Sequence, residues 1–318
     1  MAIRIAILDD YQEVARSFAD WDGVDAEVTV FHDHISNSGV LRDLLTDFDV
    51  IVAMRERTPF TAKRLASLPN LKLLVTTGMG NAAIDMDAAR EQGVLVCGTG
   101  GLASPTAELA WGLIIALTRH IAVEDAHLRE GGWQRTIGPE LAGRTLGLIG
   151  LGRLGTRMAR IADAFEMPVI AWSENLRPET AAEAGAEAVG SLDELLSRAD
   201  VVSIHTRLSE RTRGLIGARE LGLMKPTAVL VNTSRGPIVD EDALVAALKA
   251  GRIAGAGLDV YAKEPLPADH PLREAPRTLL TPHLGYVSTG TYDVFFRDAL
   301  EDVVAWQRGD PVRVLNGG

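Results

Sequence analysis

Short apolar, β-branched runs alternate with longer helical patterns along this chain, and the alternation is interrupted once before it restarts. Alternation of strand and helix predicts crossover connections, and therefore a parallel sheet. Strands that are apolar along their whole length fit burial on both faces. In the first half, strands are predicted at residues 3–8, 27–31, 50–54, 71–76 and 94–97. We therefore predict an α/β protein whose first sheet is doubly wound.

The interruption is a long helical pattern, predicted to run from Pro105 to Arg129. Ser104 suits the N-cap, Pro105 suits the first helical position, and the glycines at 131–132 end the pattern. A second series of strands then follows, at residues 146–149, 169–172, 201–205, 228–232, 256–259 and 279–281.

A chain of 318 residues is long for one compact core. Two doubly wound domains are therefore predicted. One comprises residues 1–99 together with 286–318, because the helical tail returns to pack on the first sheet. The other comprises residues 100–285 and is inserted into it.

Composition narrows the choice of partners. Lys and Arg number 32 against 43 Asp and Glu, and the net charge of -11 argues against nucleic acid or a membrane as the partner. The single cysteine, Cys97, is predicted to be a buried thiol, and no spacing suits a metal site. The chain opens on a strand instead of a signal peptide, and its longest apolar stretch, 109–117, is too short to span a bilayer. A cytoplasmic protein is expected.

The segment GLGRLG at 150–155 fits the glycine-rich dinucleotide fingerprint, with an apolar strand before it and a helical pattern after it. Gly150 allows the tight turn, Gly152 lets the backbone approach a pyrophosphate, and Gly155 allows close packing of helix and strand. Arg153 and Leu154 open the helix, whose N-terminus presents N–H groups to phosphates. The second domain is therefore predicted to be a Rossmann domain that binds NAD.

The fingerprint expects an acid about 20 residues further on, which binds the ribose hydroxyls. Ser173 stands at that place, and Glu174 follows one position late. Asn175 and Arg177 are polar neighbours that could favour an extra phosphate. We expect Glu174 to substitute for the missing acid, which makes NAD the predicted cofactor while NADP is not excluded.

Three further segments follow in order: VNTSRG at 231–236, GLDVYAKEP at 257–265 and TPHLG at 281–285. With the fingerprint, they resemble the arginine, glutamate and histidine motifs of the D-isomer-specific 2-hydroxyacid dehydrogenase family. The resemblance covers nearly the whole chain. It implies a Rossmann nucleotide domain inserted into a flavodoxin-like substrate domain, with a cleft between them, and a homodimer.

The resemblance assigns the catalytic roles. Arg235 would bind the substrate carboxylate and polarise the keto oxygen, His283 would be the acid/base, and Glu264 would orient it. Asp259 would hold the nicotinamide carboxamide. The chemistry calls for the same residue types: histidine donates a proton near neutral pH, a carboxylate on its other nitrogen favours the imidazolium, and a guanidinium grips a carboxylate at two points.

Other contacts are implied on both sides of the site. Thr106 and Thr233 would touch the cofactor, although Thr106 is equally well interpreted as a first-turn residue with a solvated hydroxyl. The N–H groups of Met79 and Gly80 would bind the substrate carboxylate. The family's Asp-Asn pair in that loop is replaced by alanines at 82–83. Arg55 could bind a second anionic group, or pair with its neighbour Glu56 on the surface.

We therefore expect an oxidoreductase that transfers a hydride between a nicotinamide cofactor and a 2-keto acid/D-2-hydroxy acid pair. Two alternatives stay open on the same fold: an NAD(H)-sensing interaction protein, and a dehydrogenase of the formate or phosphite type.

Overall fold

The computed structural model describes residues 2–317. The chain forms two compact units, Met1–Leu102 with Ser288–Gly318 (unit 1) and Ala103–Val287 (unit 2). These boundaries, 102/103 and 287/288, lie three and two residues beyond the predicted 99/100 and 285/286. Unit 2 is therefore an insertion in the sequence of unit 1.

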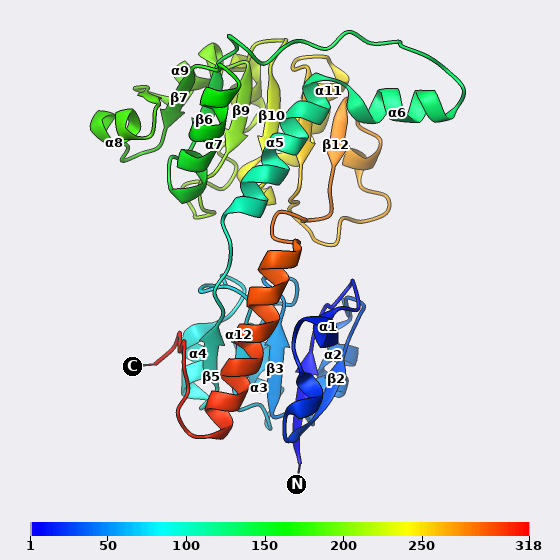
Figure 1. Cartoon of the computed structure of the whole chain (residues 1–318), viewed down its shortest axis with the longest axis vertical. Coiled ribbons are helices and arrows are strands. Elements are labelled where there is room, and N and C mark those ends of the chain that lie inside the picture. The colour runs from blue at the N-terminus through cyan, green and yellow to red at the C-terminus, as the bar shows by residue number, and fades with distance from the viewer. Residues whose placement is uncertain (1, 318) are drawn as a thin grey trace. The chain divides into compact units, whose positions relative to one another are not determined.

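Unit 1 is built on a five-stranded, all-parallel sheet with the strand order β2-β1-β3-β4-β5 (Figure 1). This is the flavodoxin-like order, as predicted. Its elements are β1 (Ile3–Ile7), α1 (Ala15–Phe18), β2 (Ala26–Val30), α2 (Ser38–Leu45), β3 (Val50–Ala53), α3 (Ala62–Ala66), β4 (Leu73–Thr76), α4 (Met86–Glu91), β5 (Leu95–Gly98) and α12 (Thr289–Gln307).

Successive residues of the unit 1 strands face opposite sides of the sheet. On β4, Leu74 packs into a cluster with Leu45 of α2 and Leu65 of α3. On the other side, α12 lies against β4 and β5. Burial on both sides explains why these strands are apolar along their whole length. Cys97 of β5 is fully buried and free, as predicted.

Unit 2 is built on a seven-stranded parallel sheet with the order β12-β11-β10-β9-β6-β7-β8. The order reverses at β6, which is the Rossmann arrangement. Its elements are α5 (Ser104–Thr118), α6 (Ile121–Arg129), β6 (Leu146–Ile149), α7 (Arg153–Ala164), β7 (Val169–Trp172), α8 (Pro178–Glu183), β8 (Glu187–Ala188), α9 (Leu192–Arg198), β9 (Val201–Ile204), α10 (Ala218–Leu223), β10 (Val229–Asn232), α11 (Glu241–Lys249), β11 (Gly255–Leu258) and β12 (Thr278–Leu280).

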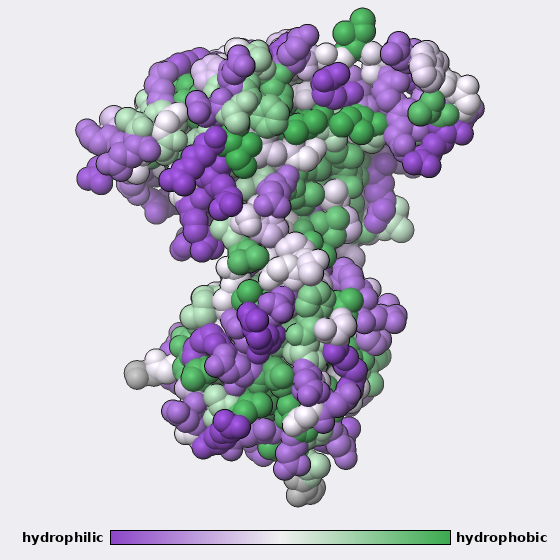
Figure 2. Space-filling view, in the orientation of Figure 1, coloured by the Kyte–Doolittle hydropathy of each residue, from purple (hydrophilic) through white to green (hydrophobic). Residues whose placement is uncertain are grey.

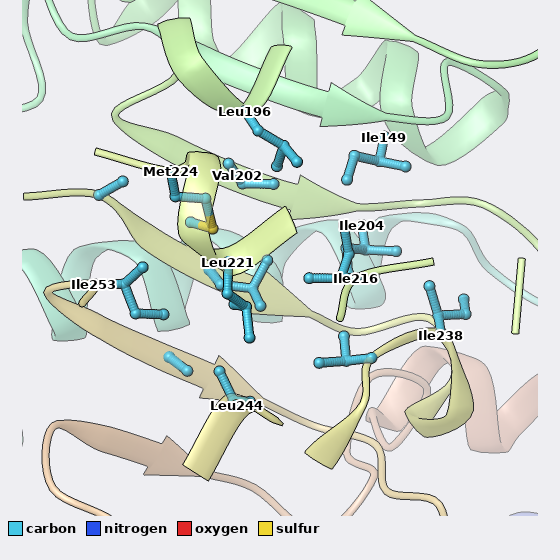
Figure 3. Packing of buried hydrophobic residues seen from close by; sticks show 14 of the residues in the cluster. Ile149, Leu196, Val202, Ile204, Ile216, Leu221, Met224, Ile238, Leu244 and Ile253 are labelled. Carbon is cyan, nitrogen blue, oxygen red and sulfur yellow. The ribbon is translucent and has the colours of Figure 1, made fainter. Parts of the chain in front are cut away.

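Two separate cores cover the two faces of this sheet. Val202 and its neighbours pack with Leu196 and Leu221 from α9 and α10 on one face (Figure 3). Val201 points the other way, into a cluster with Trp111 of α5 and Met158 of α7. The two cores hold the strands rigidly, so the loops at their carboxyl ends start from fixed positions.

The predicted long helix from 105 to 129 is wrong in one respect, because it is broken into α5 and α6. His120 lies between them with φ 53°, a left-handed conformation that a helix cannot continue. Ser104 was predicted to be the N-cap of this helix. In the structure Ser104 is the first helical residue of α5, and Ala103 is the N-cap. Within residues 2–317, no single helix has the length and hydropathy to cross a membrane; α5 and α6 reach them only as a pair bent by 63°.

One buried acid in unit 1 makes stability depend on pH. Asp302 of α12 is fully buried, and its Oδ1 accepts a hydrogen bond of 3.0 Å from Arg313 Nε. No hydrogen bond reaches its Oδ2 from the rest of residues 2–317. Burial raises the pKa of Asp302 to about 7, although Arg313 opposes the rise.

We expect Asp302→Asn to stabilise unit 1 at high pH. Since the raised pKa means that folding takes up a proton, wild-type stability falls as pH rises from about 4 to about 7, and the deficit persists above. The amide has no such deficit, so the free energy of unfolding of the variant should exceed that of the wild type increasingly over this range, by on the order of 1–3 kcal/mol at pH 8, and its melting temperature should rise accordingly. Differential scanning calorimetry at several pH values measures this.

Glu301→Gln is the matched control, since Glu301 pairs with the same Arg313 but is 62% exposed, where ion pairs contribute little. A difference between Asp302→Asn and wild type that is constant across pH would contradict the prediction.

Candidate active site

A histidine and a glutamate meet at the carboxyl edge of the unit 2 sheet. His283 follows β12, and its Nδ1 lies 2.6 Å from Glu264 Oε2 in the loop after β11. The two side chains are 18% and 30% exposed, so the pair is shielded but reachable. With Nδ1 held by the carboxylate, Nε2 is the nitrogen available to a reacting group. The predicted pairing of these two residues is thus present.

The histidine loop is held by a buried carboxylate at the end of β11. Asp259 accepts hydrogen bonds from Thr281 Oγ1 at 2.6 Å, Leu284 N at 2.7 Å and Gly285 N at 2.8 Å. Burial raises the pKa of Asp259, against the opposing effect of these hydrogen bonds. The three donors lie on both sides of His283 and fix it in a left-handed conformation, φ 56°. The contact of Asp259 with a carboxamide stays a prediction; its structural partner is the histidine loop.

Thr106 also serves this loop. Its hydroxyl donates to Gly285 O at 2.8 Å, so the interpretation of Thr106 as a solvated first-turn residue is wrong. A Cβ added at Gly285 would lie 3.1 Å from Asp259 Oδ2 and 3.3 Å from the Thr106 side chain. A side chain would therefore fit here only if two hydrogen-bonded neighbours moved by a few tenths of an ångström. The first turn of α5 is joined to the histidine loop by this contact.

The arginine loop is pressed against the glutamate loop. A Cβ at Gly236 would lie 1.9 Å from the carbonyl carbon of Tyr261, a distance that no side chain can adopt. Arg235, the residue before it, is partly buried and donates from Nη1 to Ser234 O at 2.7 Å. Asn232 Nδ2 donates to Arg235 O at 3.0 Å, which fixes the backbone of the arginine. The predicted arginine, glutamate and histidine thus come from neighbouring loops of one unit.

Tyr261 was not identified from the sequence, although it lies inside the glutamate motif. Its backbone N–H donates to Glu264 Oε1 at 2.9 Å, and so occupies the carboxylate oxygen that His283 does not use. Its hydroxyl lies 3.2 Å from Leu258 O and 3.0 Å from Thr281 O, at the ends of β11 and β12. Burial raises the pKa of Tyr261, so the phenol stays protonated and able to donate.

The dinucleotide turn lies at the same edge of the sheet, after β6. Gly150 has φ 98°, and a Cβ there would lie 2.8 Å from His205 O. At Gly155 a Cβ would lie 2.3 Å from Gly150 O, which explains the close approach of helix and turn. Gly152 differs from both, because a Cβ there would meet nothing within 4 Å. Two glycines are thus required by the chain itself, and the third faces open space.

These residues fit a dinucleotide. The N-terminus of α7, beginning at Arg153 and Leu154, has no side-chain cap, so its N–H groups are available to phosphate oxygens. At the end of β10, Thr233 Oγ1 is buried and has no hydrogen-bond partner within residues 2–317. A buried hydroxyl in this state is unfavourable unless a ligand completes it. Both observations fit a ligand at these positions, and the contact of Arg153, Leu154 and Thr233 with the cofactor stays a prediction.

The position predicted to bind the ribose is exposed. Ser173 is partly exposed after β7, and Glu174 is exposed. For neither side chain does the described chain, 2–317, provide a hydrogen bond or ion pair. His205, near the same turn, is a packing residue: its Nε2 lies 2.8 Å from Ser203 Oγ, and burial lowers the pKa of His205 to about 4. It therefore stays neutral and is no second acid/base candidate.

The remaining predicted residues belong to unit 1. Arg55 follows β3 with φ 50°, and its Nη1 donates to Thr77 O at 2.9 Å. Its guanidinium occupies the space where Gly78 would carry a side chain. Its nearest acid, Glu56, lies 3.7 Å from Arg55 Nε. Arg55 therefore braces the loop after β4 as well as contacting Glu56.

Met79 and Gly80 lie in that loop, and Met79 is 58% exposed. Asn81 shapes the loop where the alanines at 82–83 replace the family's Asp-Asn pair. It donates from Nδ2 to Arg55 O at 2.7 Å and to Thr76 Oγ1 at 2.9 Å, and accepts from Ala83 N at 2.9 Å. Asn81 was not identified from the sequence. The one feature that points to it is its place directly before the two alanines that replace the Asp-Asn pair.

Across residues 2–317, no group of His, Cys, Asp or Glu side chains is placed to hold a metal ion.

The combination of a dinucleotide turn with a histidine–carboxylate pair at one sheet edge is the arrangement of a dehydrogenase. The model of the "D-isomer specific 2-hydroxyacid dehydrogenase, NAD binding domain" matches residues 111–285. A glyoxylate reductase of Korarchaeum cryptofilum is 37% identical over 285 residues, 87% of this chain and 85% of that protein. One from Aeropyrum pernix is 42% identical over 263 residues, 79% and 78% of the two chains.

Among solved structures, a phosphoglycerate oxidoreductase from Vibrio cholerae is 40% identical and superimposes with a TM-score of 0.92, covering 97% of this chain and 100% of that one. The chain belongs to the D-isomer specific 2-hydroxyacid dehydrogenase family. Its cofactor is a nicotinamide dinucleotide, and its reaction class is hydride transfer between a 2-keto acid and a 2-hydroxy acid.

We expect Asp259→Asn to lower kcat for keto-acid reduction by about tenfold or more, because an amide nitrogen cannot accept one of the three hydrogen bonds and the histidine loop shifts. Turnover is followed by NADH absorbance at saturating NADH. Asp200→Asn is the control: that acid accepts from Thr145 N at the opposite edge of the same sheet. If Asp259 acted only on the carboxamide, the apparent affinity for NADH would fall while kcat at saturation stayed near the wild-type value.

Proposed function

We propose that this enzyme reduces a small 2-keto acid to the D-2-hydroxy acid, with His283, Glu264 and Arg235 as its catalytic group. The observation that carries the proposal is the 2.6 Å contact between His283 Nδ1 and Glu264 Oε2, held in place by Asp259 and Tyr261. A surface histidine needs no such support. An acid/base needs it, because its free nitrogen must be aimed at one atom.

The reduced nicotinamide, when bound, supplies the hydride to carbon 2 of the keto acid. As negative charge builds on the keto oxygen, His283 Nε2 gives up its proton to that oxygen. Glu264 stabilises the imidazolium before the transfer and keeps Nδ1 protonated after it. In the reverse direction the neutral imidazole takes the hydroxyl proton back. Residues of the chain therefore account for the proton, and the cofactor accounts for the electron pair.

Arg235 would bind the carboxylate at two points and polarise the keto oxygen. Its backbone, extended at φ -146°, is fixed between β10 and Gly236, so its position does not depend on a flexible loop. For unit 1 by itself, we propose that the N–H groups of Met79 and Gly80 bind a carboxylate and that Arg55 binds a further anionic group. Relatives named for glyoxylate and for phosphoglycerate support a small substrate, with or without such a group.

The function is tested with a panel of substrates. Glyoxylate, hydroxypyruvate, a phosphorylated keto acid and a bulky keto acid are offered with NADH, and formate and phosphite with NAD. We expect reduction of at least one keto acid, and a loss of turnover on the order of 10²–10⁴ in His283→Ala with NADH binding retained. His127→Ala, on α6, should behave as the wild type. Oxidation of formate or phosphite without keto-acid reduction, or full turnover by His283→Ala, would refute the proposal.

For the cofactor, we propose NAD as the preferred form with measurable use of NADP. The support is Glu174, which stands beside Ser173. The Glu174 side chain is exposed, and it is therefore able to turn toward the ribose. A carboxylate accepts the ribose hydroxyls and repels the phosphate of NADP. Arg177, two residues further than Asn175, is the opposing influence.

Glu174→Ala should therefore raise the ratio of kcat/KM with NADPH to kcat/KM with NADH by about tenfold. Glu179→Ala, an exposed acid in the first turn of α8, is the control and should leave the ratio unchanged. A wild-type preference for NADPH of about tenfold that Glu174→Ala leaves unchanged would show that Glu174 has no part in the choice.

We also propose a homodimer formed through unit 2. Helix α6 buries none of its residues, and Figure 1 shows α6 and the following segment reaching beyond the sheet. Hydrophobic surface gathers where α5 meets α6 (Figure 2). We call α6 and the segment that follows it, residues 121–137, the arm. The exposed apolar side chains of the arm are Ile121, Val123, Leu128, Trp133 and Ile137.

The arm is ordered in spite of its exposure. Glu124 accepts hydrogen bonds from Thr136 N at 2.7 Å and Thr136 Oγ1 at 2.5 Å, which pins the segment to α6. At its base lies a cavity of about 610 Å³, lined by Leu117, Val123, Ile137 and the first residues of β9 to β12. The cavity is thus at the opposite edge of the sheet from the histidine. An ordered apolar arm beside an apolar cavity suits a symmetric contact with a second copy.

Ile137→Asp should convert the dimer to a monomer, since Ile137 is 97% exposed in the single chain and a charge there would be buried in the contact. Size-exclusion chromatography with light scattering measures the mass. Leu44→Asp, an exposed leucine of α2 in unit 1, is the matched control and should remain dimeric. A monomeric wild type, or a dimeric Ile137→Asp, would contradict the proposal.

A further inference from the structure

An aromatic ring lies against the catalytic imidazole. Tyr286 follows His283 by three residues, and the centroids of the two rings are 5.2 Å apart with an interplanar angle of 68°. Tyr286 is 9% exposed, so its ring lies within the packed interior against the imidazole. An edge-to-face arrangement at this distance is the geometry that aromatic rings favour.

The backbone that carries Tyr286 is fixed at several points. Asp259 holds the N–H groups of Leu284 and Gly285, and Thr106 holds the carbonyl of Gly285. A turn then closes through a bond of 2.8 Å from Val287 N to Leu284 O. The position of the Tyr286 ring is therefore set by the same network that sets the histidine loop.

His283 needs a second restraint on its ring. Its hydrogen bond to Glu264 fixes Nδ1 but acts as a pivot, about which the imidazole plane is still able to tilt. A tilt moves Nε2 away from the atom it must protonate, because Nε2 lies on the far side of the ring from the pivot. A neighbouring ring packed at a steep angle blocks that tilt, and the Tyr286 ring is in that position.

We propose that Tyr286 is a positioning residue for His283, whose ring holds the imidazole plane so that Nε2 faces the reacting keto oxygen. The proposal rests on the proposed function, because it concerns the aim of the acid/base. The observed contact is between the two rings, so the aromatic ring carries the role and phenylalanine should replace tyrosine.

Three variants test this. Tyr286→Leu should lower kcat for keto-acid reduction by about tenfold to a hundredfold, since small displacements of a catalytic group cost that much. The dissociation constant of NADH, measured by fluorescence, should be unchanged, and KM should change less than kcat. Tyr286→Phe should stay within about twofold of the wild type. Phe165→Leu is the control, because it removes another ring contact of unit 2, with Trp111 at 4.9 Å, away from the histidine.

A spectroscopic readout separates positioning from general loss of structure. The ring current of Tyr286 should shift the NMR signals of the His283 ring protons, which are assigned by their absence in His283→Gln. Tyr286→Leu should move these signals and Tyr286→Phe should keep them. If the wild type reduces no keto acid, the proposed function fails. The NMR measurement then still shows whether the Tyr286 ring contacts the His283 ring.

The proposal is overturned if Tyr286→Leu keeps near-native kcat, if Tyr286→Phe is as impaired as Tyr286→Leu, or if the His283 signals do not respond to either variant.

Discussion

The buried carboxylate of Asp259 is the interaction on which the catalytic part of unit 2 depends. It is fully buried at the end of β11, where an unpaired carboxylate would be strongly unfavourable. Three donors from residues 281–285 offset that cost, and in doing so they draw the loop after β12 against the loop after β11. The left-handed backbone of His283 is a consequence, because donors on both sides of that residue converge on one acid. The position of His283, the proposed acid/base, is therefore set by the hydrogen bonds that Asp259 accepts from the residues around it.

A steric constraint acts beside this electrostatic one. The backbone of Tyr261 lies so close to Gly236 that no side chain fits between them. The arginine and glutamate loops are thereby kept in contact, while Tyr261 N–H occupies one oxygen of Glu264 and His283 the other. The carboxylate cannot rotate without losing one of the two. Position is enforced here by the absence of a side chain at one residue and by complete hydrogen bonding at another.

The sequence predicted both sheets, because strands buried on two faces leave a continuous apolar signal. It missed β8, whose two residues are too short to leave one, and it joined α5 to α6, since nothing in the pattern indicates a left-handed histidine at 120. The order of the motifs predicted the pairing of His283 with Glu264, and the catalytic roles of these residues stay a prediction. The residues that hold these side chains and the loop after β4 were not predicted. Tyr261 acts through its backbone N–H, and Tyr286 acts through a ring contact. Asn81 stands at a different position from the asparagine of the family's Asp-Asn pair. Those contacts are set by three-dimensional packing, and the order of residues does not encode them.

The two functional parts of unit 2 differ in how far their polar groups are satisfied. Around His283 the acids Asp259 and Glu264 are bound by donors of the chain itself, so the proposed acid/base is held in position by the chain alone. At the cofactor positions the reverse holds within residues 2–317: Thr233 Oγ1 has no partner, Gly152 faces open space, and α7 has no cap. A group that must be aimed has to be satisfied internally, whereas a group that must bind a ligand has to keep its hydrogen-bonding capacity. Within the loops at this edge of the sheet, the satisfied acids around His283 and the unsatisfied hydroxyl of Thr233 are therefore consistent with the two predicted roles.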